Sequence, residues 1–324
     1  MAFIRLLPID PTIDFLGKRT LFLILSAFLV LGSIGTFFVQ GLNFGVDFRG
    51  GILMEVETRE PADLGQLRAD LGDLDLGEIT LQEFGEPTVL LLNISRQDGG
   101  DADQRAAIEL VQETLGEQVV EYRRTEFVGP KVGAELRQAG ILATVLALGA
   151  IGIYIWLRFE WQFGLAALAA LAHDVIATIG FFAITQIEFN LATLAAVLTI
   201  AGYSINDTVV VFDRVREKLR KYKKMPMPEL LNLAINKTLT RTLLTSVTTL
   251  LALISLSVFG GEVIRGFTLG LIWGVVIGTY SSVALAVPLL LYMGLRREQL
   301  TGGDEGEADQ TPKAAIESGA KPST

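Results

Sequence analysis

The stretch GYSINDTVVVFDRVREK, residues 202–218, places two polar residues, Asn206 and Asp207, inside a run that is otherwise apolar enough to lie in lipid. A carboxylate at the centre of a membrane-spanning helix costs about 2.5–3.5 kcal/mol on insertion scales. Ionisable residues at such depth usually face a protein interior or a water-filled path and mark a functional site. The stretch therefore predicts a membrane helix with a functional acid, and the rest of the chain has to define the kind of site.

Composition indicates a protein that crosses a membrane several times. The chain has 324 residues, of which 50% are apolar. Several apolar runs approach the length of about 20 residues that spans a bilayer as a helix. The six predicted spans are 20–39, 138–157, 163–183, 190–212, 240–259 and 266–294. The last five predict a transmembrane bundle over residues 138–294, separated from the first span by a long polar segment.

The first predicted span follows two cations, Lys18 and Arg19, as a secretory signal peptide would. Its apolar core is longer than a usual signal-peptide core, and no clear Ala-x-Ala cleavage site follows it. We therefore expect an uncleaved transmembrane anchor, preceded by a cytoplasmic segment at residues 1–19.

The positive charges of the short segments predict the orientation. Lys and Arg number three in 1–19, one in 158–162, nine in 213–241 and four in 295–324, whereas the alternate loops 184–189 and 260–265 carry only Arg265. Loops rich in Lys and Arg stay in the cytoplasm. We expect a multi-pass protein of the cytoplasmic (inner) membrane, with both termini in the cytoplasm and the polar segment outside it.

That polar segment, residues 40–137, reads as a separate acidic domain with 20 Asp and Glu against 9 Lys and Arg. Its pattern predicts, in order, a strand at 49–58, a helix at 61–72, strands near 77–84 and 87–95, a helix at 103–115 and a strand at 119–128. The order β-α-β-β-α-β is that of a ferredoxin-like α+β domain. It contains no His or Cys, so we expect it to make contacts rather than carry out chemistry, and a folded spacer without a ligand remains an alternative.

Several functions are made improbable by what the chain lacks. It has no Cys and one His, which excludes cysteine chemistry and a multi-histidine metal site. We expect no metal, no cofactor, no nucleic-acid partner and no enzyme activity. The acidic segment 295–324 is polar and rich in Gly, Ser and Pro, and we expect a disordered cytoplasmic tail.

The fourth span contains the acids that are candidates for proton transfer. Tyr203 and Ser204 precede Asp207 by four and three positions, so they share its side of a helix. Asp213 shares another side with Asn206, and its position beside an Arg fits an interfacial residue. Asp207 is either a titrating group or one member of a static pair, and the spacing leaves both open.

A partner for Asp207 is available at the start of the fifth span. Arg241 opens the string RTLLTS, residues 241–246, and enters from the same cytoplasmic side. Buried charges in membranes usually pair, and a long Arg side chain can reach an acid at that depth. The alternative is that Arg241 only anchors its helix at the membrane surface.

The third span holds the single histidine, in LAHDVIATIG at residues 171–180. His173 and Asp174 are neighbours and cannot both face one side of a helix, so we expect one of them to meet the polar face of the fourth span. The free pKa of histidine lies nearest neutrality, which makes His173 a candidate for proton transfer. Asp174 is a candidate because it is an acid inside a membrane span. A histidine held permanently by hydrogen bonds is the alternative.

The last span carries four small residues at a spacing of four: Gly266, Gly270, Gly274 and Gly278. Such a stripe lets a neighbouring helix approach closely. It predicts helix packing, either within the chain or against a partner.

Several strings, in order along nearly the whole chain, resemble the SecD/SecF family of protein-export membrane subunits, which belongs to the resistance-nodulation-division superfamily. The strings are IDFLGKR at 13–19, FGVDFRGG at 44–51, HD at 173–174, GYSINDTVVVFDRVRE at 202–217, RTLLTS at 241–246 and GTYSS at 278–282. The match falls on the SecF half, so the resemblance implies a separate SecD partner.

The resemblance implies a six-span fold with a ferredoxin-like domain after the first span. It implies that the protein, in complex with SecD and beside the SecYEG channel, uses protons and the proton-motive force to promote export of a translocating preprotein across the lipid bilayer. The family's intramembrane acid and arginine map onto Asp207 and Arg241, and Asp213 is a second candidate. The family's junction motif maps onto Gly45, Asp47, Gly50 and Gly51, whose glycines suit a turn or pivot.

Two other classes of function remain open. The chain is alternatively a noncatalytic scaffold that stabilises the translocation complex, with Asp207 and Arg241 as a fixed pair. The second alternative is half of a small-molecule exporter of the same superfamily. Such a function needs a large apolar cleft for the exported molecule, and the sequence shows no sign of one.

Overall fold

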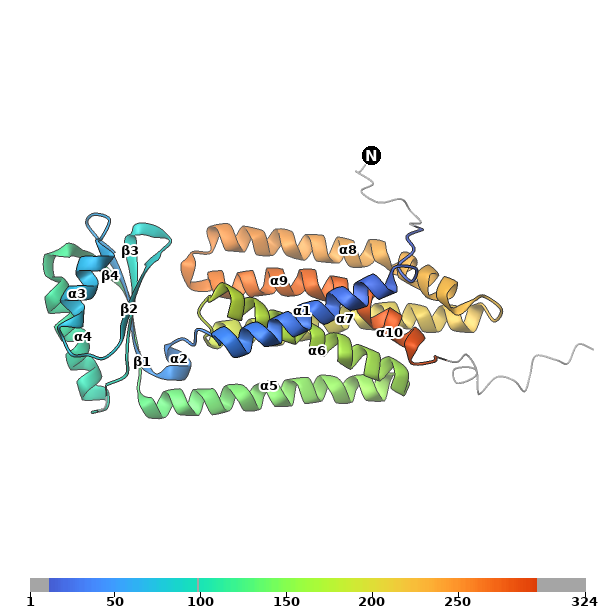
Figure 1. The fold of residues 1–324 in the computed structure, drawn as a ribbon, viewed down its shortest axis with the longest axis horizontal. Coiled ribbons are helices and arrows are strands. Elements are labelled where there is room, and N and C mark those ends of the chain that lie inside the picture. Colours follow the sequence, from blue (N-terminus) through green and yellow to red (C-terminus); the bar gives the residue numbers. More distant parts are fainter. Residues whose placement is uncertain (1–11, 98, 296–324) are drawn as a thin grey trace, which may run out of the picture.

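The computed structural model describes residues 12–97 and 99–295. The chain forms a small α+β domain at one end and a long helical bundle at the other (Figure 1). Residue 295 is the only described position of the segment expected to be a disordered tail, and residues 296–324 lie outside the described range. Residues 1–11 lie outside it as well.

Six helical segments are long and apolar enough to cross a membrane, which confirms the six-span prediction. They are α1 (Arg19–Gln40), α5 (Pro130–Arg158), α6 (Trp161–Thr185), α7 (Leu191–Lys221), α8 (Met227–Phe259) and a composite of α9 (Arg265–Ser281), the π-helical segment η3 (Ser282–Ala286) and α10 (Val287–Tyr292), with the 3₁₀ turn η2 (Glu262–Ile264) leading into it. The π turn ends at Ala286, two residues before Pro288, which has no backbone N–H to continue the α-helical ladder.

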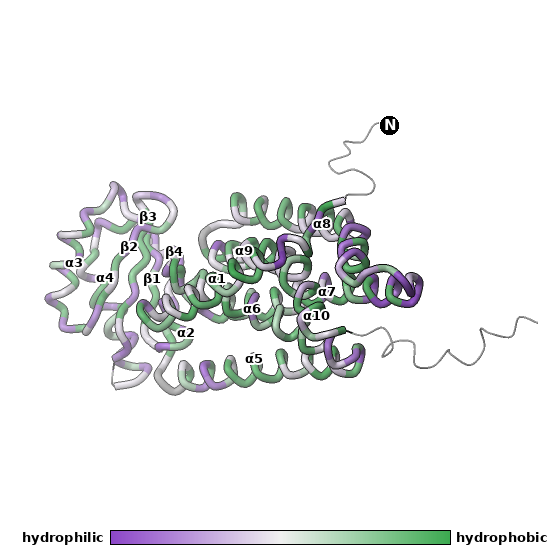
Figure 2. Tube along the Cα trace, turned by 45° about the vertical axis from the view of Figure 1, so that its right-hand side comes forward, coloured by the Kyte–Doolittle hydropathy of each residue, from purple (hydrophilic) through white to green (hydrophobic). Residues whose placement is uncertain are grey.

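Three helices extend well beyond the predicted spans. α5 begins at Pro130 rather than at 138. At the end of the bundle far from the α+β domain, α7 continues to Lys221 rather than ending at 212, and α8 begins at Met227 rather than at 240. The hydropathy of the α7 and α8 extensions is low because their outer faces are basic, and Figure 2 shows them as hydrophilic. Their inner faces are buried, as at Leu219 and Leu231, and this packing keeps them helical.

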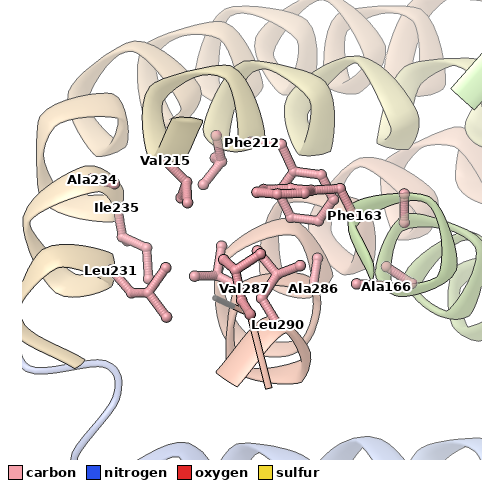
Figure 3. Packing of buried hydrophobic residues seen from close by; sticks show 14 of the residues in the cluster. Phe163, Ala166, Phe212, Val215, Leu231, Ala234, Ile235, Ala286, Val287 and Leu290 are labelled. Carbon is pink, nitrogen blue, oxygen red and sulfur yellow. The ribbon is translucent and has the colours of Figure 1, made fainter. Parts of the chain in front are cut away.

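The core of the bundle at the end far from the α+β domain is a cluster of aromatic and aliphatic side chains (Figure 3). The rings of Phe163 and Phe212 meet edge to face with centroids 5.1 Å apart. Small residues such as Ala166 and Ala286 let α6, α7 and the last span approach each other around these rings. α5 lies along one side of the bundle, and many of its large apolar side chains are exposed (Figure 1).

The α+β domain follows the predicted order. Its elements are β1 (Gly51–Thr58), α3 (Leu64–Gly72), β2 (Ile79–Phe84), β3 (Glu86–Ile94), α4 (Asp101–Leu115), the 3₁₀ turn η1 (Gly116–Gln118) and β4 (Val119–Val128). The strands form one antiparallel sheet in the order β2-β3-β1-β4, which is the ferredoxin-like arrangement. The first strand begins at Gly51 rather than at 49, because residues Val46–Arg49 form a short helix, α2.

Alternate residues of β1 face opposite sides of the sheet. Ile52 and Met54 pack in the core formed with α3 and α4, which cover the face away from the bundle (Figure 1). Leu53 packs instead with Val46 of α2 on the other face. The domain therefore presents the second face of its sheet toward the bundle.

Candidate functional site

Asp207 lies inside the bundle with 4% of its surface exposed. Its Oδ2 atom is buried and, in the described part of the chain, accepts no hydrogen bond. The hydroxyls of Tyr203 and Thr242 are also buried and have no partner among the residues that the structure describes. Buried polar atoms are normally hydrogen-bonded, because leaving one unpaired costs about 1–3 kcal/mol. A carboxylate oxygen left open in this way suits a group that takes up a proton.

Arg241 does not make the direct contact with Asp207 that the sequence suggested. No hydrogen bond or ion pair joins the two side chains among the described residues, although the charge of Arg241 acts on Asp207. α8 begins at Met227, so Arg241 lies well inside a continuous helix rather than at its start. The neighbouring Thr242 takes the buried position on this helix, and Arg241 itself is exposed.

A second acid, Asp174 of α6, is the centre of a buried hydrogen-bond network. Its Oδ2 accepts a hydrogen bond from Ser281 of α9 at 2.7 Å and another from Ser204 of α7. Its Oδ1 lies 2.8 Å from Nδ1 of His173. Asp174 is 0% exposed and His173 is 4% exposed. The network joins three helices through one carboxylate.

As expected, one residue of the His173–Asp174 pair meets the fourth span, because Asp174 accepts a hydrogen bond from Ser204 of α7. Both side chains are buried, because the imidazole turns back to its neighbour's carboxylate instead of pointing to the opposite side. Nε2 of His173 is buried without a partner in the described residues, and the ring lies 6.1 Å from the ring of Tyr280.

Sequence reasoning did not assign Ser281 to the site. Ser281 is 107 residues from Asp174, so no local spacing connects them. The available signal was the string GTYSS, which contains Ser281 three residues after Gly278. Ser204, in contrast, was placed on the same helix side as Asp207, and the structure shows that it bonds to Asp174.

The other two candidates in α7 lie away from this network. Asn206 is exposed. Asp213 is partly exposed, and its two carboxylate oxygens accept hydrogen bonds from Nη2 of Arg158 at 2.7 and 2.9 Å. This geometry is that of an ion pair at the surface of the bundle.

The glycine stripe of α9 faces other helices of this chain. A Cβ at Gly274 would lie 2.2 Å from Cγ1 of Ile200, and one at Gly278 would lie 3.0 Å from Cβ of Ser204. The stripe therefore allows α9 to approach α7 closely, which brings Ser281 and Ser204 to the same carboxylate. Gly266 and Gly270 similarly lie against residues of the α6–α7 region.

The junction between α1 and the α+β domain is bound to the loop that joins α6 to α7. Phe44 and Phe189 form a parallel β-bridge, and Asp47 Oδ2 accepts a hydrogen bond from the backbone N–H of Leu191 at 2.9 Å. Gly50 and Gly51 have φ angles of 73° and 123°, which a side chain would disfavour. The glycines are thus needed for the turn into β1.

Comparison with known proteins agrees with this geometry. The family described as protein export membrane protein SecD/SecF, C-terminal, matches residues 108–296, and the SecD/SecF GG motif matches residues 35–62. The protein translocase subunit SecF of Cereibacter sphaeroides is 47% identical over 306 residues, which cover 92% of this chain and 94% of that one. The subunit of the same name from Rickettsia bellii is 46% identical over 290 residues, covering 89% and 95%.

Two solved structures are also similar. The crystal structure of SecDF, a translocon-associated membrane protein from Thermus thermophilus, matches with a TM-score of 0.81 and 33% identity, covering 90% of this chain and 40% of that chain. A structure of SecDF in a super-membrane-facing form matches with a TM-score of 0.63 at the same identity and coverage. The chain therefore spans two fifths of the length of these SecDF chains.

The fold and its buried ionisable groups define a multi-pass membrane protein, a six-span half of the resistance-nodulation-division type with an added ferredoxin-like domain. The predicted family resemblance is confirmed. The chain belongs to the SecD/SecF family of protein export membrane proteins.

Proposed function

We propose that this chain is a SecF-type subunit of the Sec protein-translocation machinery, which works with SecD and uses the proton-motive force to promote preprotein export across the cytoplasmic membrane. The observation that carries the proton part is the buried carboxylate of Asp207, with one oxygen open, in the middle of a membrane-length helix. The export part rests on the similarity to proteins named as translocase subunits.

Asp207 is the proposed proton site. It takes a proton from the outer side, loses its attraction to Arg241, and allows α7 and α8 to shift relative to each other. Release of the proton toward the cytoplasm restores the attraction. One charge that crosses 100 mV supplies about 2.3 kcal/mol, which biases a conformational equilibrium by more than tenfold.

The Asp174 network has a supporting role in this proposal. Asp174 holds α6, α7 and α9 together through Ser204 and Ser281, and it contacts α7 one helical turn from Asp207. A shift of α7 has to strain or rearrange these hydrogen bonds. His173 and Asp174 are therefore proposed as a second group that responds to, or shares, the proton.

The proposed partners are SecD, the SecYEG channel and the exported chain. The matched SecDF structures contain further chain beyond the part that this protein matches, which supports a SecD partner. Both termini are proposed to lie in the cytoplasm and the α+β domain outside it, from the distribution of Lys and Arg. The domain then stands where an emerging preprotein can be contacted.

A static scaffold requires the charges of Asp207 and Arg241 to be neutralised by a permanent ion pair. The described structure does not make this pair, and Asp207 Oδ2 stays open. This observation favours the titrating role over the scaffold.

The test is preprotein export in membrane vesicles that contain this chain, SecD and the channel, with and without an imposed proton-motive force. We expect Asp207→Asn to lose the force-dependent part of export while the complex still assembles. Glu217→Gln is the matched control, because Glu217 is an acid of the same helix that lies in an exposed ion pair with Arg214. Force-dependent export that is equal in wild type and Asp207→Asn would overturn the proposal.

A further inference from the structure

The segment between α1 and β1, expected from the sequence to form a turn or pivot, is bound to the bundle by hydrogen bonds. The backbone N–H of Gly45 donates to the carbonyl of Phe189 at 3.0 Å, and the N–H of Phe189 donates to the carbonyl of Asn43 at 2.7 Å. The side-chain amide of Asn43 also donates to the carbonyl of Gln186 at 3.0 Å. These bonds tie the junction to the α6–α7 loop at several points.

An aromatic cluster covers this bridge. The ring of Phe48 in α2 stacks on the ring of Phe189 with centroids 6.1 Å apart. Phe182 of α6, which is fully buried, meets Phe189 edge to face at 5.5 Å. Buried apolar contacts of this kind shield the bridge from competing water. The junction is therefore held by packing as well as by hydrogen bonds.

Asp47 adds a specific contact to the beginning of α7. The N-cap of this helix is Asn190, which forms a capping box with Thr193 and so satisfies the N–H of Thr193. The N–H of Leu191, the first residue of the helix, is left for Asp47 Oδ2. A carboxylate at this place also interacts favourably with the positive end of the helix dipole. Asp47 is thus part of the junction in the sequence, and its side chain contacts the beginning of α7.

The junction is equally firmly joined to the sheet. Val46 packs on Leu53 of β1 and Leu91 of β3. A Cβ at Gly133 of α5 would lie 3.2 Å from the backbone N of Gly50, so α5 also approaches the junction closely. α2 consequently has one side in the α+β domain and the other on the ends of α6 and α7.

We propose that Asp47 is a positioning residue that couples α7 to the α+β domain, so that a shift of α7 moves the domain with it. This inference rests on the proposed function, because it takes Asp207 as the origin of the shift. Asp207 lies 16 residues after Leu191, which is about 24 Å along one continuous helix. If α7 moves as a rigid body, a displacement at Asp207 also displaces its N-terminus at Leu191. The hydrogen bond from Leu191 to Asp47 then moves α2 and, through it, β1.

Distances between spin labels in the full chain, assembled with a cysteine-free SecD in liposomes, test the coupling. The chain has no native cysteine, so Glu113→Cys on α4 and Phe259→Cys at the end of α8 place one label on each part. We expect a narrow distance distribution in the otherwise wild-type chain, and a shifted mean when Asp207→Asn is added.

Asp47→Ala is expected to broaden this distribution and to abolish the shift caused by Asp207→Asn. It should also remove force-dependent export and leave the force-independent part unchanged. Asp47→Asn keeps an oxygen acceptor for the Leu191 N–H and should restore most of the coupling. Asp63→Ala is the matched control, because Asp63 caps α3 inside the domain by accepting from the Gly65 N–H at 2.8 Å.

The inference is overturned if Asp47→Ala gives a distribution as narrow as wild type, or if Asp207→Asn still shifts the mean in the Asp47→Ala background. Failure of the proposed function looks different. Force-dependent export would then survive Asp207→Asn, whereas the width of the Asp47→Ala distribution would still decide whether Asp47 holds the domain in place.

Discussion

The Ser281 hydroxyl donates to Asp174 Oδ2 at 2.7 Å, and both residues are fully buried. This bond links the last span to α6 across the bundle, while Ser204 links the same carboxylate to α7. A single acid of α6 therefore links this helix to two others. Asp207, the proposed proton site, lies about one turn along α7 from Ser204, so the packing of the bundle and the proposed chemistry are physically connected.

Two substitutions of Asp174 should show how much of its contribution to stability comes from hydrogen bonds and how much from its charge. Asp174→Ala leaves the Ser204 hydroxyl and Nδ1 of His173 without their partner, at about 1–3 kcal/mol for each unpaired group, whereas Ser281 keeps its hydrogen bond to the Gly278 carbonyl. We expect a large fall in the thermal unfolding midpoint of the purified protein in detergent. Asp174→Asn keeps one oxygen acceptor and should lower the midpoint much less. Equal losses in the two variants would contradict this account of the network.

Asp207 and Arg241 allow a test by a double substitution. In a static charge pair, Asp207→Asn combined with Arg241→Gln should be tolerated better than either single change, because no lone buried charge remains. For a proton site we expect no rescue: force-dependent export should be lost in both single variants and in the double variant. Recovery of export in the double variant would favour the scaffold.

Close packing of α9 on α7 makes Gly274 sensitive to size. Gly274→Ala puts a Cβ within 2.2 Å of Ile200 Cγ1, and overpacking of this kind costs about 1–3 kcal/mol. The unfolding midpoint in detergent should fall. Gly149→Ala in α5 is the control, because a Cβ there meets nothing within 4 Å. A midpoint that falls equally in both variants would indicate a general helix effect.

Glu188, in the α6–α7 loop, should make stability depend on pH. Burial raises the pKa of its carboxyl above 4.5, against a hydrogen bond to Asn190 and the charge of Arg124. The cost of burying the ionised form is fully present above the folded-state pKa and shrinks as the pH falls toward 4.5. It is gone only below 4.5, where the carboxyl of the unfolded chain is protonated as well. Glu188→Gln should therefore raise the unfolding midpoint at neutral pH.

The gain from Glu188→Gln should shrink as the pH falls to about 4.5, measured by thermal unfolding across that range. Glu113→Gln, at an exposed position of α4, should change the midpoint little at any pH. A gain that grows with acidity would reverse the sign and contradict the assigned cause.

Much of the fold follows from local patterns. The six spans are visible because a bilayer demands about 20 apolar residues in succession, whatever the rest of the chain does. The β-α-β-β-α-β order is visible because strands and helices have different side-chain periods. The extensions of α7 and α8 were not visible, since their helical state depends on burial of one face, as at Leu219 and Leu231, against other helices.

The candidate site likewise has a part that local sequence predicts and a part that it does not. The ionisable residues of the membrane-spanning segments, Asp207 and Asp174 among them, can be found from the sequence, because a charge in an apolar run is a local property. The contacts between helices cannot: Ser281 bonds to Asp174, Arg241 makes no ion pair with Asp207 in the described chain, and Asp47 accepts a hydrogen bond from the first residue of α7. Each of these depends on the rotation and spacing of packed helices, which side-chain contacts over the whole bundle set and which no local stretch of sequence encodes.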